Sequence, residues 1–323
     1  MLTISIVTTS MNRTAHLIKM AKQISNLSFH IEHIVIDFGS VVPIKRTDLP
    51  EDQRIRLHRI ENPYGKWWLT HAFNVGFSLS NSDFILKLDA DVLLTQRFAD
   101  ELLIKLSESQ AHLICSRLTF QDWSLPSELF TTNGLFLCKR SSLEAIKGFN
   151  PYIRGWGWDE IDLYCRFFMA GFPIVRLSSN DEVVIEHGDD QREPPIEKIS
   201  KGMSSFWSNT KCKEPTSRMR AQNEKNRQVA IASMVKNISW PSLLEYRETY
   251  FTSGSYPILP KVNFFEQDEY SYLLLVLARM LLNPSPPMEV AYRVLHKLGT
   301  GPYTPSSAKK LIDSCGVDLS LVI

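Results

Sequence analysis

The sequence has few cysteines, no surplus of charge of either sign and no long hydrophobic run. Its five cysteines are widely spaced and odd in number, which favours neither a disulfide framework nor a Cys-x-x-Cys metal site. The 36 basic and 35 acidic side chains give a formal charge of +1, so no general basic field would attract nucleic acid. The longest apolar run, Tyr270 to Leu282, is broken by Arg279 and is too short to span a bilayer.

The N-terminal residues also lack the pattern of a secretory signal. Met1 to Val7 indicates a first strand, with no basic segment before it. Together with the cysteine usage this predicts a reducing compartment, either the cytoplasm at large or the inner face of the membrane. With 323 residues, 44% of them hydrophobic and 22% charged, the chain has an ordinary globular composition and suffices for two domains or one large α/β domain with an extension.

Strand and helix patterns alternate along the first 110 residues. Apolar, β-branched runs predict strands at 2–8, 33–37, 54–60 and 84–88. Helices are predicted after Asn12, which can cap the first of them, and over 68–79 and 96–106. This alternation predicts an α/β fold: a mostly parallel sheet with helices on both faces, which binds its ligands at the carboxyl ends of the strands.

The pattern changes beyond residue 110. Shorter strands and helices follow, and past residue 200 the chain is first highly charged and then helical between Pro-rich turns, without a chemical motif. We expect a catalytic domain over 1–200, made of halves 1–110 and 111–200, and a mostly helical C-terminal extension over 201–323. The extension either buries its own apolar helices or contacts a membrane surface or a second copy of the chain.

Candidate site residues follow the predicted strands. Asp89 and Asp91 come directly after the fourth strand, and residues i and i+2 of an extended segment point the same way. Two carboxylates so placed suit a divalent cation and the phosphates that it bridges, although a solvated acidic turn would look the same. Arg13 after the first strand suits a diphosphate or is a surface residue near a helix start. Asp37 accepts hydrogen bonds from a base or ribose, or it closes a turn before Gly39.

Two further segments carry unusual residue combinations. Gly76 lies inside a predicted helix, where glycine costs about 1 kcal/mol relative to alanine, so either a ligand or the sheet approaches closely there. Trp156 stands between glycines shortly before Asp159, Glu160 and Asp162. An indole face suits a sugar ring, and a neighbouring carboxylate can take a proton from a sugar hydroxyl. The alternative is an acidic first turn that complements a helix dipole.

Together these features resemble the nucleotide-sugar glycosyltransferases of the GT-A fold, which include family 2 enzymes. The narrower resemblance is to the inverting group that contains β-1,4-galactosyltransferases and chondroitin polymerases. It covers about residues 3 to 195 and lies in the order and spacing of five elements, none of them specific alone. These are Thr9-Ser-Met-Asn12-Arg13, Asn74-Val-Gly-Phe77, Asp89-Ala-Asp91, a segment from Asn133-Gly134 through Gly148-Phe149 to Gly155-Trp-Gly-Trp-Asp-Glu160, and His187.

The sequence departs from the group at three points. Thr9 replaces a proline, Trp158 stands where the group has its second glycine, and the Glu-Asp pair of the group is reversed to Asp159-Glu160. By register Glu160 takes the place of the catalytic base, with Asp159 as the alternative and Asp162 as a weaker third candidate.

The resemblance implies a metal-dependent inverting transfer of a hexose or N-acetylhexosamine from a UDP-sugar to a hydroxyl acceptor, in glycan or polysaccharide synthesis. It implies Mn2+, or Mg2+, at Asp91 and His187. The implied nucleotide-sugar contacts are Thr9, Asn12, Arg13, Asp37, Asn74, Lys87, Asp89, Ala90 and Asp91. The implied acceptor contacts are Gly134, Trp156, Gly157 and Trp158.

Two other functions remain open at this point. One is a sugar-binding or assembly subunit that has the fold without turnover. The other is a nucleotidyltransferase, which uses a similar sheet and Mg2+. Nucleotidyltransferases carry a Gly-rich loop after the first strand, and residues 8–14 contain no glycine, which counts against that alternative.

Overall fold

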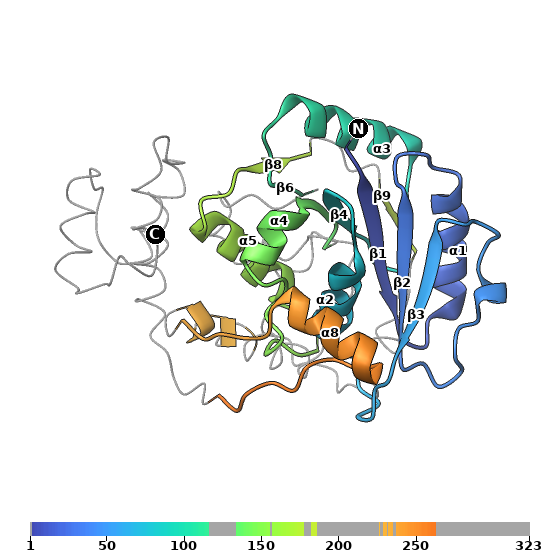
Figure 1. The fold of residues 1–323 in the computed structure, drawn as a ribbon. Coiled ribbons are helices and arrows are strands. Elements are labelled where there is room, and N and C mark those ends of the chain that lie inside the picture. The colour runs from blue at the N-terminus through green and yellow to red at the C-terminus, as the bar shows by residue number, and fades with distance from the viewer. Residues whose placement is uncertain are drawn as a thin grey trace, which may run out of the picture.

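A central mostly parallel sheet organises the protein (Figure 1). The computed structural model describes residues 2–115, 134–155, 157–177, 182–185, 226, 229–230, 232–234 and 237–262. Within these residues the sheet has seven strands in the order β3-β2-β1-β4-β7-β6-β8. They are β1 (Ile4–Ser10), β2 (Glu32–Phe38), β3 (Ile55–Ile60), β4 (Phe84–Lys87), β6 (Leu113–Cys115), β7 (Phe136–Lys139) and β8 (Ile174–Arg176). Strand β7 runs antiparallel to both of its neighbours, and the other pairs are parallel.

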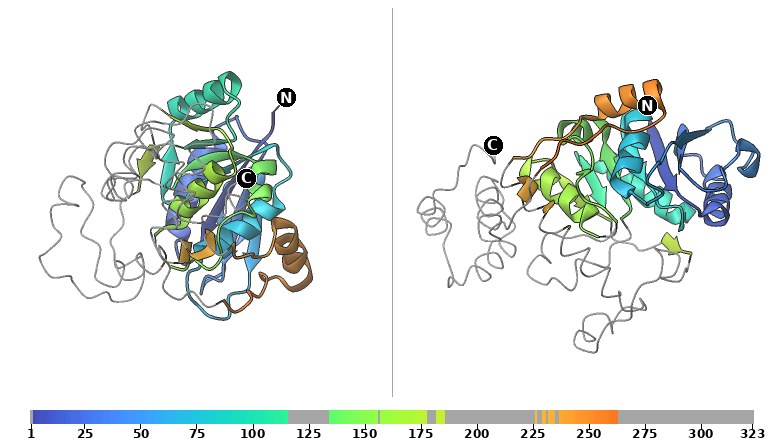
Figure 2. Two further views of the ribbon diagram at one scale, coloured as in Figure 1. Left: turned by 90° about the vertical axis from the view of Figure 1, so that its left-hand side faces the viewer. Right: turned by 90° about the horizontal axis from the view of Figure 1, so that it is seen from below.

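Helices cover both faces of this sheet (Figures 1 and 2). They are α1 (Thr14–Ser25), α2 (Leu69–Leu79), α3 (Gln96–Glu108), α4 (Arg140–Ala145), α5 (Asp159–Met169) and α8 (Leu243–Ser253), with a short 3-10 turn η1 (Arg46–Asp48). The prediction of an α/β protein with a mostly parallel, doubly covered sheet is therefore confirmed. In the described part of the chain, no helix combines the length and the hydrophobicity needed to cross a bilayer.

Two hydrophobic cores lie on opposite sides of the sheet, because successive strand residues point to opposite faces. Ile6 and Leu86 join the core under α1 and α3. Their neighbours Val7 and Ile85 join the other core, with α2, α5 and α8. The continuous apolar runs of β1 and β4 thus reflect burial on both faces.

Helix α2 packs unusually closely on the sheet at Gly76. A Cβ atom at this position would collide with Cγ1 of Val7 and come within 3.3 Å of Cγ1 of Ile36. Of the two explanations for a glycine inside this helix, close packing of helix on sheet is the one that the structure shows.

Part of the chain beyond residue 200 packs on the sheet domain. Helix α8 lies against α2 (Figure 2), and its residues Leu243 and Tyr246 are buried in the same core as α2. The backbone N–H of Glu61, just after β3, donates to the carbonyl of Gly254 at 2.9 Å. Residues 237–262 therefore help to close one face of the sheet, while 263–323 lie outside the described residues and the extension remains a prediction.

The prediction that Asn12 caps the first helix is wrong. Helix α1 begins after Arg13 without a side-chain cap. Asn12 has a φ of 58°, and its side-chain oxygen accepts a hydrogen bond from the N–H of Val41 at 2.8 Å. Asparagine tolerates this left-handed conformation better than most residues, so Asn12 instead ties the turn after β1 to the turn after β2.

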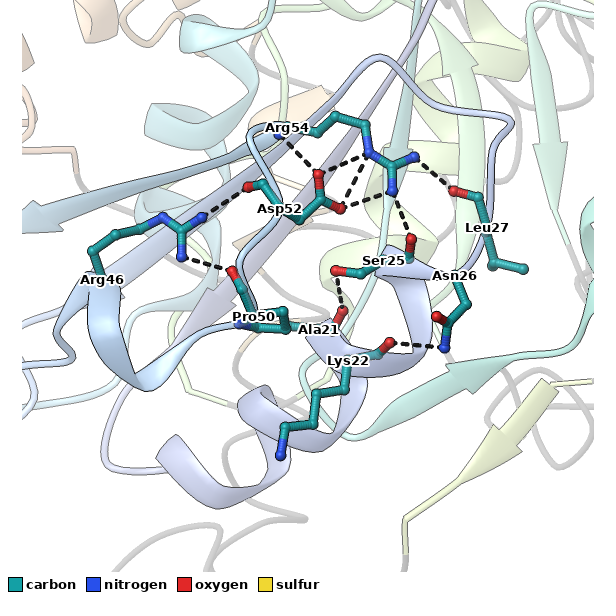
Figure 3. Close-up of polar contacts among 9 residues, drawn as sticks. All are labelled: Ala21, Lys22, Ser25, Asn26, Leu27, Arg46, Pro50, Asp52 and Arg54. Carbon is teal, nitrogen blue, oxygen red and sulfur yellow. Dashed lines mark hydrogen bonds and ion pairs between the residues drawn. The ribbon is translucent and has the colours of Figure 1, made fainter.

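Arg54 closes the C-terminal end of α1 from the start of β3 (Figure 3). Its guanidinium donates to the carbonyls of Leu27 and Ser25, each at 2.7 Å, and pairs with Asp52 at 2.7 Å. Hydrogen bonds and the charge of Arg54 hold the pKa of Asp52 well below its usual range. Helix ends leave carbonyl groups without intrahelical partners, and a cation placed there stabilises them.

We expect Arg54→Met to lower the free energy of unfolding by about 2 kcal/mol, because charge-assisted hydrogen bonds are lost and two carbonyls are left unpaired. Urea denaturation measures this change. Lys19→Met, at an exposed position of the same helix, is the matched control and should change it by less than about 0.5 kcal/mol. Equal midpoints for the two variants would show that Arg54 does not stabilise the helix end.

Candidate active site

The carboxyl ends of β1, β2 and β4 lie together and carry most of the predicted site residues. In the parallel registers Ser10 pairs with Asp37, and Val7 pairs with Lys87. Thr9, Asp89 and Asp91 consequently face the same edge of the sheet. The hydroxyls of Thr9 and Ser10 are buried and have no hydrogen-bond partner within the described structure. Buried polar groups are normally satisfied, so this edge has capacity to bind a polar ligand.

Asp91 pairs with Arg13 across the ends of β4 and β1. Nη1 of Arg13 lies 3.2 Å from Oδ2 of Asp91, and both side chains are largely buried. Two short strands, β5 (Val92–Leu94) and β9 (Glu182–Val184), pair next to this contact. The N–H of Ile185 donates to the carbonyl of Asp91 at 2.6 Å, two residues before His187 in the sequence. His187 itself lies outside the described residues.

Lys87 joins the two halves of the predicted site. Its Nζ lies 2.9 Å from the carboxylate of Asp89 and 2.9 Å from Oε1 of Glu160, and the side chain is completely buried. Glu160 stands 73 residues further along the chain, in the first turn of α5. The structure thus brings the candidate base beside the Asp-x-Asp segment, as the predicted site requires.

The buried carboxyl groups around Lys87 differ in the direction of their pKa shifts. Burial raises the pKa of Asp89 to about 6, with the Asp91 and Glu160 carboxylates adding to the shift and Lys87 opposing it. Burial, the charge of Glu160 and a hydrogen bond between the two groups raise the pKa of Asp159 well above its usual range. Burial opposes ionisation of Glu160, but the Lys87 ammonium and the hydrogen bonds from Asp159 and Lys87 outweigh it and lower its pKa. Of the two neighbouring acids, Glu160 therefore ionises at the lower pH and Asp159 at the higher.

Gly134 packs directly against the ion pair of Lys87 and Glu160. Its φ is 64°, and a Cβ atom there would overlap Oε1 of Glu160 and come within 2.7 Å of Nζ of Lys87. The glycine is thus required both by its left-handed backbone and by the space that the ion pair occupies.

Gly65 offers a matched comparison, because it has a φ of 60° and nothing within 4 Å of its own added Cβ. We expect Gly65→Ala to cost about 1 kcal/mol through backbone strain alone. Gly134→Ala should cost about 2 kcal/mol more, because of overpacking against Glu160 and Lys87. Urea unfolding of both variants measures the two losses in free energy of unfolding. Equal losses would mean that a Cβ atom at Gly134 has room beside Glu160 and Lys87.

Trp158 begins helix α5 in a conformation that favours glycine. Its φ is 67°, and its carbonyl accepts the hydrogen bond from the N–H of Asp162 that opens the helix. Its ring packs against Ile153, Val229 and Ala230, which offsets the strain. This is the position at which the resembling group has a glycine, and the left-handed backbone explains that preference. Trp156 lies outside the described residues.

Asp162, the weakest candidate base, has a structural role. Its side chain is completely buried, and Oδ2 lies 2.7 Å from Nη2 of Arg166. Arg166 also donates to the carbonyls of Ile146 and Gly148, each at 2.8 Å. Asp162 thus holds the arginine that ties α5 to the end of α4.

Two predicted nucleotide contacts already have protein partners. The amide of Asn74 donates to the carbonyl of Phe149 at 2.9 Å and accepts from its N–H at 2.8 Å, so it links α2 to the segment before α5. Asp37 is completely buried, accepts from the N–H groups of Ser40 and Ile44, and pairs with Arg59 at 2.6 Å. These contacts account for both residues without a ligand, and a nucleotide contact for either remains a prediction. Ala90 is buried within the turn between Asp89 and Asp91.

The carboxylate oxygens of the site are of a kind that suits a divalent cation. Four carboxyl groups, those of Asp89, Asp91, Asp159 and Glu160, lie near the basic side chains of Arg13 and Lys87, and burial, with the charges of Asp91 and Glu160 adding to it, raises the pKa of Asp89. Carboxylate oxygens are ligands that Mg2+ and Mn2+ prefer. Among the described residues no three His, Cys, Asp or Glu side chains form a metal-binding group, and His187 is not one of them.

The sheet, the Asp-x-Asp segment at its edge and the carboxylate of α5 resemble the nucleotide-sugar glycosyltransferases of the GT-A fold. Residues 112–188, about a quarter of the chain, match the family model described as "N-terminal domain of galactosyltransferase". A curated relative, an "Uncharacterized membrane protein" from Buchnera aphidicola subsp. Schizaphis graminum, is 25% identical over 113 residues. That match spans 35% of this chain and about a third of the relative, 31% of its length.

Solved glycosyltransferase structures are also similar to this chain. A mannosyltransferase from Pyrobaculum calidifontis, in complex with GDP-Man and Mn2+, is 14% identical with a TM-score of 0.48, and the match covers 98% of this chain and 81% of that one. A mutant of Drosophila β-1,4-galactosyltransferase 7, in complex with manganese, UDP-Gal and xylobiose, is 15% identical with a TM-score of 0.42, and the match covers 67% of this chain and 82% of that one.

Proposed function

We propose that this protein is a metal-dependent inverting glycosyltransferase that moves a hexose or N-acetylhexosamine from a UDP-sugar to a hydroxyl acceptor in glycan or polysaccharide synthesis. The observation that carries the proposal is the contact through Lys87, which unites Asp89 at the end of β4 with Glu160 at the start of α5. A transfer between two bound substrates needs the donor site and the base close together in a fixed geometry, and the Lys87 contact joins these two segments.

The donor is proposed to bind at the carboxyl ends of β1 and β4. The hydroxyl of Thr9, which has no partner among the described residues, and the guanidinium of Arg13 would contact the nucleotide and its diphosphate. Asp91, with His187 from the segment after β9, would hold Mn2+ or Mg2+. When bound there, such a cation neutralises charge that develops on a diphosphate leaving group.

The acceptor hydroxyl is proposed to reach Glu160, with Trp156 and Trp158 as acceptor contacts. Glu160 takes the proton of that hydroxyl while the oxygen attacks the anomeric carbon opposite the diphosphate. The bond from the anomeric carbon to the diphosphate oxygen breaks, UDP leaves, and the configuration inverts. The lowered pKa of Glu160 and the raised pKa of Asp159 support Glu160 as the base.

A screen of UDP- and GDP-sugars with Mn2+, read as free nucleotide, tests this function. We expect release of UDP from one or a few UDP-sugars, faster with the acceptor present and at background level when the metal is chelated. Formation of pyrophosphate from a nucleoside triphosphate and a sugar phosphate would instead show a nucleotidyltransferase. Binding of a nucleotide sugar without any release would show a subunit that lacks turnover.

A further inference from the structure

Lys87 is an unusual residue for its position. It ends β4 inside the sheet, its side chain is 0% exposed, and its Nζ lies 4.8 Å from the centre of the Phe73 ring. Taking a charge out of water costs several kcal/mol unless partners compensate it. A lysine retained here needs a reason, since an apolar residue would fill the same space.

Its partners give that reason. Burial would lower the pKa of Lys87, but the charges of Asp89 and Glu160 outweigh burial and raise it, so the side chain is an ammonium group. Both carboxylates lie 2.9 Å from Nζ. The ammonium group is enclosed by the protein, whereas a side chain that binds the donor must reach it. These contacts account for Lys87 without a ligand, and a nucleotide-sugar contact for it remains a prediction.

The same geometry constrains Glu160. Oε1 is held between Nζ of Lys87 and the backbone of Gly134, where no side chain would fit. Asp159 adds a hydrogen bond to the carboxylate. With Oε1 fixed in this way, the rotation of the Glu160 carboxylate is restricted and its direction relative to Asp89 is set.

We propose that Lys87 is a positioning residue that acts through Glu160: its buried ammonium group fixes one carboxylate oxygen of the base beside the donor site and leaves the other oxygen for the acceptor hydroxyl. This inference rests on the proposed function. Lys87 also couples the two sides of the site. Because the same ammonium group contacts Asp89 and Glu160, the placement of the base depends on Asp89, a residue of the donor side.

A double-mutant cycle tests the inference with Lys87→Met, Glu160→Gln and the double variant. We expect Lys87→Met to lower kcat roughly 10- to 100-fold, since a misplacement of about 1 Å costs that much, and to leave KM for the UDP-sugar within about threefold. In the Glu160→Gln background the same change should lower kcat by less than about threefold, because there is no base left to position. Lys139→Met, at an exposed position on the neighbouring strand β7, is the control.

Two further measurements keep the outcome clear. Lys87→Arg retains the positive charge and should recover part of the kcat that Lys87→Met loses. It also serves as the test variant where Lys87→Met folds poorly. Urea midpoints of the wild type, the two single variants of the cycle and the double variant report whether Lys87 and Glu160 are coupled, independently of turnover. A wild type that releases no nucleotide refutes the proposed function. Additive effects on kcat and on the urea midpoints, or a rise in KM with kcat unchanged, overturn the role of Lys87.

Discussion

Glu160→Gln is expected to lower kcat for sugar transfer by about 10^2- to 10^4-fold while UDP still binds, because general base catalysis contributes that much and the amide cannot take a proton. Asp159→Asn should reduce kcat by less than about tenfold. The pKa of Asp159 is raised beside Glu160, and an asparagine amide can donate a hydrogen bond to that carboxylate in its place. Steady-state kinetics with the UDP-sugar found in the screen, and calorimetry with UDP, measure the two effects.

Two additional variants guard against simpler explanations of this difference. Glu160→Asp keeps the charge but withdraws it by one methylene, so its kcat should fall between those of the wild type and Glu160→Gln. Glu144→Gln breaks an exposed pair with Arg140 on α4 and should leave turnover unchanged. If Asp159→Asn were inactive while Glu160→Gln kept nearly full activity, the two acids would have to exchange roles.

Four strands and three helices of the first 110 residues could be predicted because their signals are local, whereas the short strand β5 was not predicted. The apolar runs that form β1 and β4 are continuous, since both faces of these strands are buried, and α3 keeps one apolar face against the sheet. The cost of a glycine inside α2 indicated a close approach, and the structure shows which surface comes close.

The contacts that assemble the site could not be read from the sequence in the same way. Nothing near Lys87 in the chain indicates that Glu160 will meet it, because the contact depends on how α5 packs beside β4. The paired amide of Asn74 and the return of α8 onto α2 likewise join distant segments. Asn12 had a strong local preference for a helix cap, and a contact with Val41 decided otherwise.

Asp91→Asn should produce the second large effect, a loss of at least about 100-fold in metal-dependent UDP release. A divalent cation contributes several kcal/mol to stabilising charge on a leaving group, and each 1.4 kcal/mol corresponds to a tenfold change in rate. Asn keeps the shape of the side chain but removes the negative charge that a hard cation prefers. The ion pair with Arg13 is lost as well, which leaves the guanidinium beside the diphosphate site.

Binding of Mn2+ in the presence of UDP, followed by calorimetry, separates loss of the metal from damage to the fold. Asp91→Asn should weaken that binding, whereas Asp100→Asn, at an exposed position on the adjacent helix α3, should not. His187→Ala extends the test to the second proposed ligand, and it should weaken Mn2+ binding without changing the urea midpoint. If Asp91→Asn released UDP at the wild-type rate without added metal, Asp91 would not hold a cation, and its pairing with Arg13 would remain as its role in the site.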